Sequence, residues 1–187
     1  MSVKKIIKNI LGYIRCSLAG VAYPQGGVYI GRNVHFANGK NIKLGKQVQI
    51  RPDVDLFAGE IFQIGNGCDI GTRNRINGNV VIEENVLLGP DNYISSEDHC
   101  YENITLPIME QGTYFVHNNG HGELKIGADS WIGTHVAIIG DVRIGKHCVI
   151  GANSVVVKDV PDFSVVVGIP GRVVKTYDQK EGKWVKV

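Results

Sequence analysis

The sequence has few aromatic residues, no concentrated basic stretch and no apolar run that could span a bilayer. Aromatic side chains make up 7% of the 187 residues, and 20 Lys and Arg residues are spread along a chain whose net charge is +2. Nucleic-acid-binding proteins concentrate cations and aromatic rings on one surface, so we expect no nucleic-acid partner. A bilayer span requires about 20 consecutive apolar residues, and Lys8, Asn9 and Arg15 interrupt the apolar stretch at the start of the chain. We therefore expect neither a membrane span nor a signal peptide.

The same N-terminal stretch has a helical pattern instead. Six aliphatic residues fall on one helical face, and Lys4, Lys5, Lys8 and Arg15 are interspersed among them. The aliphatic residues are Ile6, Ile7, Ile10, Leu11, Ile14 and Leu18. This spacing predicts an amphipathic helix. Two roles remain open: packing on the rest of the protein or on a neighbouring subunit, and weak contact of a basic, apolar helix with the inner membrane surface.

The rest of the chain is dominated by an aliphatic residue at every sixth position. In the second half these residues are Ile126, Ile132, Ile138, Ile144, Ile150 and Val156. Earlier, the same spacing joins Leu44, Ile50 and Leu56, and then Ile64, Ile70, Ile76, Ile82, Leu88 and Ile94. A period of six fits neither an α-helix nor a single strand. It predicts short strands joined by tight corners and stacked into a solenoid, with the aliphatic side chains inside.

Two further positions of the repeat carry small residues. A glycine directly follows many of the aliphatic residues, and we expect it to supply the permissive backbone that the corners require. These glycines are Gly31, Gly45, Gly65, Gly71, Gly89, Gly127, Gly133, Gly145 and Gly151. The fifth position of the repeat is small and includes Cys68 and Cys148, whose thiols would pack as compact hydrophobes. With Cys16 and Cys100 they show no paired spacing, so we expect four reduced cysteines in a cytoplasmic protein.

Three segments in the second half carry a more specific pattern. They read IGADSWIGTHV (126–136), GANS (151–154) and VKDVP (157–161). In these segments, and over roughly residues 28–175 as a whole, the chain resembles the hexapeptide-repeat acyltransferases. The resemblance implies an all-β fold, a left-handed parallel β-helix with three hexapeptides per coil. The left hand comes from the resemblance alone, because parallel strands are normally connected in the right-handed sense.

The repeat stops between Ile94 and Ile126. A loop of this length exceeds the roughly 12–15 residues common in compact domains, and its content of rings predicts an ordered arm. The ring-bearing residues are His99, Tyr101, Tyr114, Phe115, His117 and His121. We therefore expect an amphipathic helix at 1–22, a β-helix at 23–160 with an extruded arm at 95–125, and a C-terminal segment at 161–187.

The arm begins with DHCYE (98–102), followed by LPI (106–108) and QG (111–112). This pattern resembles the arm of the maltose, galactoside and xenobiotic O-acetyltransferases. The resemblance implies an acetyl-transferring enzyme with His99 as its catalytic base. Imidazole titrates near neutral pH and can take the proton of a hydroxyl group. We expect no acyl intermediate on Cys100, because adjacent side chains of an extended segment point apart.

The remaining histidines are not expected to do chemistry. His35, His135 and His147 occupy outward positions of the repeat. His117 and His121 are four residues apart and could bind zinc, as histidines do in the γ-class carbonic anhydrases, which share the fold. The intervening Asn-Asn-Gly is a turn signal, so this pair would not lie on one helical face. We expect no metal, with a zinc-binding solenoid as an alternative.

The resemblance also implies acetyl-coenzyme A as the acyl donor, bound in a groove between neighbouring subunits of a homotrimer. Motif position places Trp131, Gly133, Thr134, Gly151 and Ala152 beside the pantetheine arm of this donor. Backbone N–H groups near Thr134 would stabilise the oxyanion during direct transfer from donor to acceptor. The cofactor phosphates would be neutralised by cations near the end of the repeat. These cations are Lys158, Arg172 and Lys175.

The acceptor is expected to be a sugar hydroxyl of a surface polysaccharide or its precursor. Arg73, Asn74, Arg75 and Asn77 stand at positions expected to face outward beside the arm, and Tyr101 lies in the arm itself. Of these, Asn74, Asn77 and Tyr101 are the candidate acceptor ligands. A sugar-amine N-acetyltransferase and a non-enzymatic solenoid are the alternatives.

Overall fold

The computed structural model describes residues 3–22, 26–113 and 122–187. Its helices are α1 (Val3–Leu18) and the short α2 (Ile108–Gln111), with a 3-10 turn η1 (Gly39–Asn41). Its strands are β1 (Tyr29–Ile30), β2 (His35–Ala37), β3 (Ile42–Leu44), β4 (Gln49–Ile50), β5 (Asp55–Ile64), β6 (Asp69–Ile70), β7 (Arg75–Ile82), β8 (Leu87–Leu88), β9 (Tyr93–Ser95), β10 (Leu124–Ile126), β11 (Trp131–Ile132), β12 (Ala137–Ile139), β13 (Arg143–Ile144), β14 (Val149–Ile150), β15 (Val155–Val156), β16 (Ser164–Val167), β17 (Arg172–Asp178) and β18 (Lys183–Lys186).

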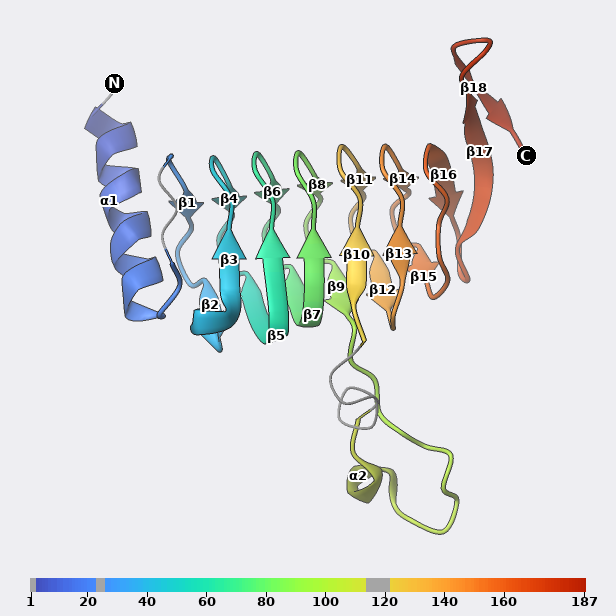
Figure 1. Cartoon of the computed structure of the whole chain (residues 1–187), viewed down its shortest axis with the longest axis horizontal. Coiled ribbons are helices and arrows are strands. Elements are labelled where there is room, and N and C mark those ends of the chain that lie inside the picture. The colour runs from blue at the N-terminus through green and yellow to red at the C-terminus, as the bar shows by residue number, and fades with distance from the viewer. Residues whose placement is uncertain (1–2, 23–25, 114–121) are drawn as a thin grey trace.

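The strands stack into coils with three parallel faces (Figure 1). Face 1 consists of β1, β4, β6, β8, β11, β14 and β16. Face 2 consists of β2, β9, β12 and β15 with the first halves of β5 and β7. Face 3 consists of β3, β10 and β13 with the second halves of β5 and β7. In Figure 1 the strands of face 3 run upward in front and the chain returns behind them as the coils advance, so the β-helix is left-handed, as predicted.

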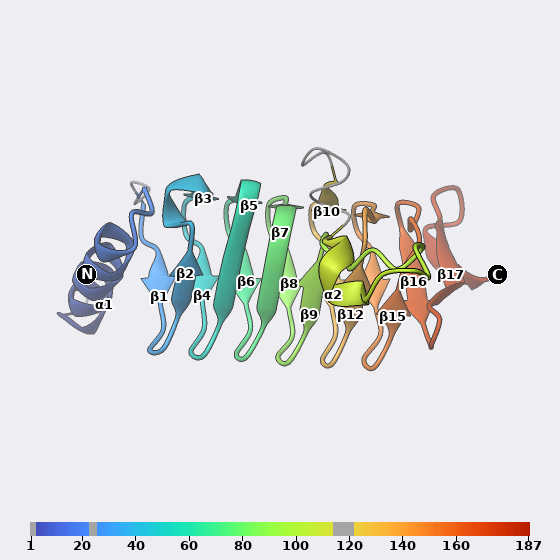
Figure 2. The same cartoon turned by 90° about the horizontal axis from the view of Figure 1, so that it is seen from below.

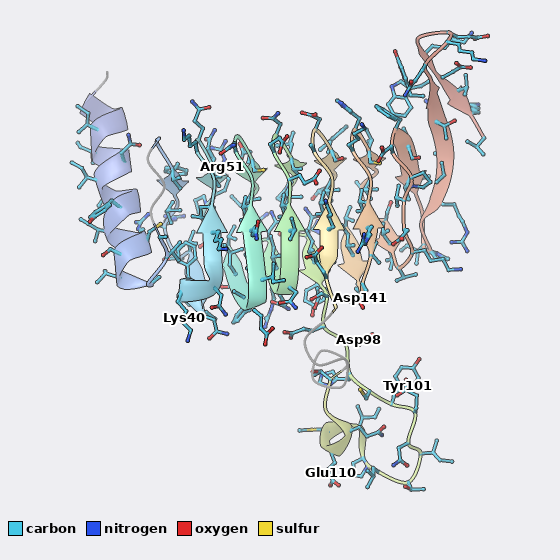
Figure 3. All side chains as sticks on the ribbon, in the orientation of Figure 1. Lys40, Arg51, Asp98, Tyr101, Glu110 and Asp141 are labelled. Carbon is cyan, nitrogen blue, oxygen red and sulfur yellow. The ribbon has the colours of Figure 1, made fainter. Side chains whose placement is uncertain are left out.

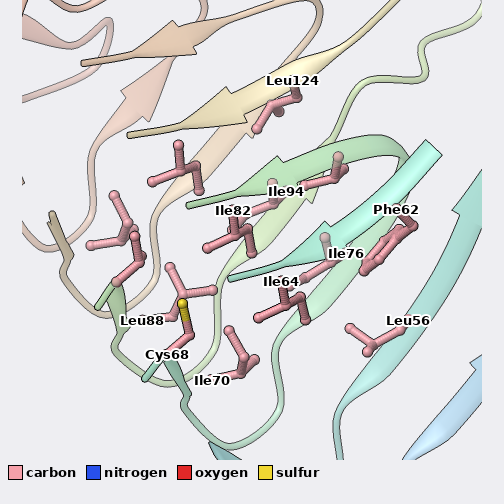
Figure 4. Packing of buried hydrophobic residues seen from close by; sticks show 14 of the residues in the cluster. Leu56, Phe62, Ile64, Cys68, Ile70, Ile76, Ile82, Leu88, Ile94 and Leu124 are labelled. Carbon is pink, nitrogen blue, oxygen red and sulfur yellow. The ribbon is translucent and has the colours of Figure 1, made fainter. Parts of the chain in front are cut away.

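The six-residue repeat forms the core. Ile70 on face 1 lies between Ile50 and Leu88, which are 20 and 18 residues away in the sequence. Every aliphatic residue of the predicted repeat is buried, and Figure 4 shows the layers in contact. Burying one such side chain contributes about 1.5–3 kcal/mol. All four cysteines are free and buried, and burial raises the pKa of the Cys68 thiol to about 11. The repeat therefore predicts both the interior and the place of its cysteines.

Two strands are longer than the repeat predicts. β5 and β7 run without interruption across the corner between faces 2 and 3. In β5 the register shifts between Ala58 and Phe62, where the sequence has two residues more than the repeat requires. Phe62 is fully buried beside this irregularity. A large ring therefore occupies the part of the core where the corner is widened.

The glycines of the repeat are required for a different reason from the one expected. None of the nine has a positive φ; that conformation is adopted by other corner residues, such as Gln47 and Asp53. A Cβ atom added to Gly65 would lie 2.6 Å from the backbone of Glu83 and Glu84 in the next coil. The glycines therefore permit neighbouring coils to approach, rather than permitting the corner to turn.

Helix α1 covers the open end of the first coil (Figure 1). Gly12 and Cys16 are buried there, and the Arg15 guanidinium donates a hydrogen bond of 2.6 Å to the Gly31 carbonyl. At the other end, β17 and β18 form an antiparallel hairpin that continues face 1 from β16. Within the described residues, no helix is long and apolar enough to cross a membrane.

A glycine substitution tests the close approach of the coils. We expect Gly65→Ala to lower the free energy of unfolding by about 1–3 kcal/mol, because its Cβ overlaps the next coil. Gln47→Gly is the control, since Gln47 has φ +58° and glycine adopts that conformation freely. It should change the stability by less than about 1 kcal/mol. Urea unfolding measures both, and a neutral Gly65→Ala would contradict the explanation.

Candidate functional site

The arm leaves the solenoid at the corner between faces 2 and 3, after β9 (Figures 1 and 2). Hydrogen bonds to both neighbouring coils fix its root. The Asn79 N–H donates to the Ser96 hydroxyl at 2.8 Å, and the Ser96 N–H donates to the Asn77 carbonyl at 3.2 Å. On the other side, the Gly140 N–H donates to the Ser95 carbonyl at 2.9 Å. The first residues of the arm are therefore held by the rigid β-helix.

Hydrogen bonds within the arm hold the described residues 98–113 in a defined conformation. Its two limbs meet where the Cys100 N–H donates to the Gly112 carbonyl at 3.1 Å. Farther out, the Gln111 side-chain amide donates to the carbonyls of Asn103 and Leu106 at 2.9 and 3.0 Å. The predicted aromatic and histidine residues at 114, 115, 117 and 121 lie outside the described residues.

His99 stands on the inner part of the arm with its side chain exposed. Its backbone N–H donates to the Asp98 carboxylate at 2.8 Å, and no described residue makes a hydrogen bond to its ring. Cys100 is buried, so the two neighbouring side chains point apart, as expected. Desolvation, with the negative charges of Glu102 and Asp98, raises the pKa of the Cys100 thiol. The exposed imidazole is thus free to act as a base, whereas the thiol stays protonated.

Asn77 lies at the root of the arm and has an unsatisfied polar atom. The residue is 8% exposed, so the expectation that it faces outward is wrong. Its amide nitrogen donates to the Tyr93 hydroxyl at 3.3 Å. Its Oδ1 atom is buried and has no hydrogen-bond partner. An unpaired buried acceptor costs about 1–3 kcal/mol, and such atoms in native proteins are rare. This oxygen therefore marks a place where a ligand could donate a hydrogen bond.

The expectation that Asn74 faces outward is wrong. Its side chain is 1% exposed and donates to the carbonyls of Gly71 and Gly89 at 2.7 and 2.9 Å. Its Oδ1 accepts the Asn92 N–H at 3.0 Å. Asn74 occupies the fifth position of the repeat that begins with the inward Ile70, a position that holds buried residues elsewhere in the repeat, such as Cys68 and Cys148. It joins neighbouring coils and has no capacity left for a substrate.

Tyr101 is 64% exposed and lies on the outer limb of the arm, away from Asp98 at the root (Figure 3). Within one chain it is thus turned to solvent and not toward the β-helix. His35, His135 and His147 are exposed at corners or on faces of the coils, as expected.

Trp131 belongs to a column of outward side chains on face 1. It is 51% exposed and is paired with Leu87 on one side and Val149 on the other. The column continues through Val165 to Lys175, which is paired with Lys186 across the terminal hairpin. An apolar strip therefore ends in two lysines directly opposite each other, an arrangement that repels unless an anion lies between them. The sequence does not point to Lys186, because the hairpin lies outside the six-residue repeat and its register cannot be predicted from that repeat.

The corner between faces 1 and 2 adjoins this column and carries four of the predicted residues. Gly133 and Gly151 are explained by packing, since a Cβ on either would collide at 2.7 Å with the following coil. The Thr134 hydroxyl donates to the Pro90 carbonyl at 3.0 Å. Within the described part of the chain, the backbone N–H groups of Thr134 and Ala152 have no acceptor. They remain available to carbonyl oxygens of a ligand.

The three predicted cations do not come together in one chain. Lys175 lies on face 1, and Arg172 lies at the start of the same strand, opposite Val167. Lys158 follows β15 on face 2 and so lies toward the corner that carries the arm. Lys158 and Lys175 therefore lie on different faces at the C-terminal end of the β-helix.

The described residues contain no group of three or more His, Cys, Asp or Glu side chains that could hold a metal ion. A groove of about 500 Å³ on face 3 is lined by Lys125, Arg143 and Lys146, among others. It contains none of the predicted catalytic, donor-binding or acceptor-binding residues. Glu83 forms an ion pair of 2.6 Å with Lys125 there, and this contact lowers the pKa of the Glu83 carboxyl.

Comparison with known proteins agrees with the geometry. The family model described as bacterial transferase hexapeptide (six repeats) matches residues 124–158. A protein of Mycobacterium tuberculosis (strain ATCC 25618 / H37Rv), named a probable acetyltransferase, is 32% identical over 166 residues, which are 76% of this chain and 52% of the relative. The galactoside O-acetyltransferase of Escherichia coli (strain K12) is 30% identical over 149 residues, 74% of this chain and 65% of that enzyme. The chain thus spans about half to two thirds of the length of these two relatives.

Among solved structures, a mutant of an N-acyltransferase from Bacillus cereus, in complex with dTDP-4-amino-4,6-dideoxyglucose and coenzyme A, superposes with a TM-score of 0.73. The sequences are 17% identical, and the match covers 91% of each chain. This likeness shows the fold. Together with the repeat and the two sequence relatives, it shows that the chain belongs to the hexapeptide-repeat acyltransferase family.

Proposed function

We propose that the protein is an acetyl-coenzyme A-dependent O-acetyltransferase that modifies a sugar hydroxyl of a surface polysaccharide or its precursor. The observation that carries the proposal is the exposed imidazole of His99, held by an arm whose root is bonded to two coils. The likeness to galactoside O-acetyltransferase supports the reaction type. The four free, buried cysteines fit a cytoplasmic enzyme.

The outward column of face 1 and the adjoining corner form the proposed donor site. Pantetheine is long and narrow, with two amides, and the column beside Trp131 offers apolar contact along its length. The Ala152 N–H would bind one of its carbonyl oxygens, which leaves the Thr134 N–H for the thioester carbonyl. The phosphates of the nucleotide would lie against Lys175, with Arg172 and Lys158 contributing charge. Gly133 and Gly151 act indirectly, by bringing the coils that carry these groups together.

A homotrimer is proposed because the described part of the arm leaves its apolar side chains exposed. Ile104 and Met109 at its tip are 96% and 93% exposed, and Leu106 and Ile108 are also exposed. Four apolar side chains at the end of an arm need cover, which a neighbouring solenoid can supply. Such a contact would carry His99 of one subunit to the donor groove of the next, and would let Lys158 and Lys175 serve one site.

In the proposed mechanism, His99 accepts the proton of the acceptor hydroxyl as that oxygen attacks the thioester carbonyl carbon. The Thr134 N–H donates a hydrogen bond to the oxyanion of the tetrahedral intermediate. When the intermediate collapses, the carbon–sulfur bond breaks, and the imidazolium returns its proton to the departing thiolate. Cys100 takes no part, because its thiol is buried and its pKa is raised.

The acceptor would contact Asn77, whose unpaired Oδ1 can accept a hydrogen bond from a second sugar hydroxyl. Tyr101 would reach the acceptor from the arm. A sugar amine is the second candidate acceptor, because the Bacillus cereus N-acyltransferase structure holds an amino sugar nucleotide. Screening of sugar and amino-sugar nucleotides distinguishes the two.

We expect His99→Ala to lower kcat/KM for the best acceptor by about 10²–10⁴-fold, the usual contribution of a general base. Thiol release from acetyl-coenzyme A measures the effect. His35→Ala is the matched control, since it removes another exposed histidine at the far end of the β-helix. Cys100→Ala should also remain active. Wild-type turnover in His99→Ala would refute the assignment of the base.

Asn77→Ala should separate binding from stability. The substitution removes the unpaired buried oxygen but also the hydrogen bond to the Tyr93 hydroxyl. These two effects oppose each other, so the free energy of unfolding should change by less than about 1 kcal/mol, while loss of one hydrogen bond to the acceptor raises the acceptor KM by about tenfold. The KM for acetyl-coenzyme A should not change. Steady-state kinetics and urea unfolding together test this, and an unchanged acceptor KM would remove Asn77 from the site.

Lys175→Gln should raise the KM for acetyl-coenzyme A by about tenfold, with little change in kcat, because it removes a charge from the phosphate end of the groove. Lys40→Gln, at the opposite end of the β-helix (Figure 3), is the control. Equal KM values for the two variants would contradict the proposed course of the donor.

A further inference from the structure

Helix α1 attaches to the β-helix through its smaller side chains. Gly12 and Cys16 are buried, and Ala19, just beyond the helix, is partly buried. Arg15 ties the helix to the carbonyls of Ile30 and Gly31 at the edge of β1. The contact is close and is fixed by hydrogen bonds, so the orientation of the helix about its own axis is determined.

The apolar face of α1 is not the face that packs. At 100° per residue, the aliphatic residues centre on the side opposite Gly12 and Cys16. They are 40–84% exposed, and they are Ile6, Ile7, Ile10, Leu11, Ile14 and Leu18. Of the roles that the sequence left open, the helix packs on the β-helix, and it does so through the side that carries Gly12 and Cys16. Folding of the described chain leaves that side uncovered.

The charge of the helix restricts what could cover it. Residues 3–18 include three lysines and one arginine, and contain no aspartate or glutamate. At the same 100° spacing the cations lie beside and behind the aliphatic side, and backbone carbonyls hold Arg15. Two copies meeting through the aliphatic side would therefore gain no charge pairing, because neither helix contains a carboxylate. An anionic surface, in contrast, would attract the cations and receive the aliphatic side chains.

The place of the helix suits a flat partner. α1 lies across the N-terminal end of the β-helix, and the arm and the terminal hairpin project elsewhere (Figures 1 and 2). Because Gly12 and Cys16 face the first coil, the apolar side points away from the stack. A planar surface could therefore contact the length of the helix without meeting another part of the described chain.

We propose that α1 docks the protein on an anionic lipid bilayer, lying in the interface with its aliphatic side chains among the acyl chains and its lysines near the lipid phosphates. No described helix could span the membrane, so this is surface attachment. The donor column at Trp131 is four strand spacings from β1, which places it roughly 19 Å from β1, and the helix lies beyond β1. The groove would stand clear of the headgroups and open sideways.

Co-flotation of the full chain with vesicles tests the docking, in the absence of any substrate. One set of vesicles contains phosphatidylglycerol and phosphatidylcholine, and the other contains phosphatidylcholine alone. We expect the protein to float with the anionic vesicles and to bind the neutral ones at least tenfold more weakly. The variant Ile10→Glu/Ile14→Glu should lose at least tenfold in binding to the anionic vesicles.

Ile61→Glu is the matched control, because Ile61 is 41% exposed on the β-helix away from α1. It should float like the wild type. Circular dichroism confirms that the variants are folded. Thiol release from acetyl-coenzyme A, compared between the wild type and Ile10→Glu/Ile14→Glu, shows whether the loss of vesicle binding leaves the transferase activity unchanged. Failure of the wild type to bind anionic vesicles, or equal binding by Ile10→Glu/Ile14→Glu, would overturn the proposal. Analytical ultracentrifugation gives a further test. If the wild type does not bind vesicles and Ile10→Glu/Ile14→Glu has half the mass of the wild-type assembly, a second copy of the chain is the partner and the proposal is overturned.

Discussion

Neighbouring coils of the β-helix lie one strand spacing apart, and this close contact determines the rest of the structure. At that distance the backbone of the next coil leaves no room for a Cβ at corner positions such as Gly65, Gly127 and Gly133. The same contact places each inward side chain directly on its equivalent in the next coil, as Ile70 lies on Leu88. No coil could bury its aliphatic residues alone. Stability and geometry therefore come from one stacking interaction repeated along the axis.

The proposed site uses the rigidity of this stack. Ser96 ties the root of the arm to the coil that carries Asn79, and the column of outward side chains that includes Trp131 keeps its register because the strands beneath it do. The arm itself contributes exposed apolar residues, notably Ile104, and an exposed His99. In a single chain Ile104 has no cover and His99 has no donor beside it in the proposed site. In the proposed trimer, a neighbouring subunit would cover Ile104 and would present its bound donor to His99.

The sequence predicts the interior well, because a fixed period gives every residue of the repeat an inward or outward place. Asn74 follows the same rule, and applying it strictly would have placed that residue inside. Features without a period are harder to predict. The register that brings Lys186 beside Lys175 depends on a hairpin outside the repeat. The amphipathic pattern predicts helix α1, but not that Gly12 and Cys16, rather than the aliphatic residues, form its contact.

Mixing of two inactive variants tests the shared site most directly. His99→Ala subunits lack the base, and Ala152→Trp subunits have a blocked donor corner, so neither alone should transfer acetyl groups. Refolding them together would form trimers in which an intact His99 faces an intact corner on the neighbouring subunit. Activity should then return at on the order of a quarter of the sites for random mixing in a cyclic trimer. Absence of any recovery, with both variants folded and trimeric, would contradict a site built between subunits.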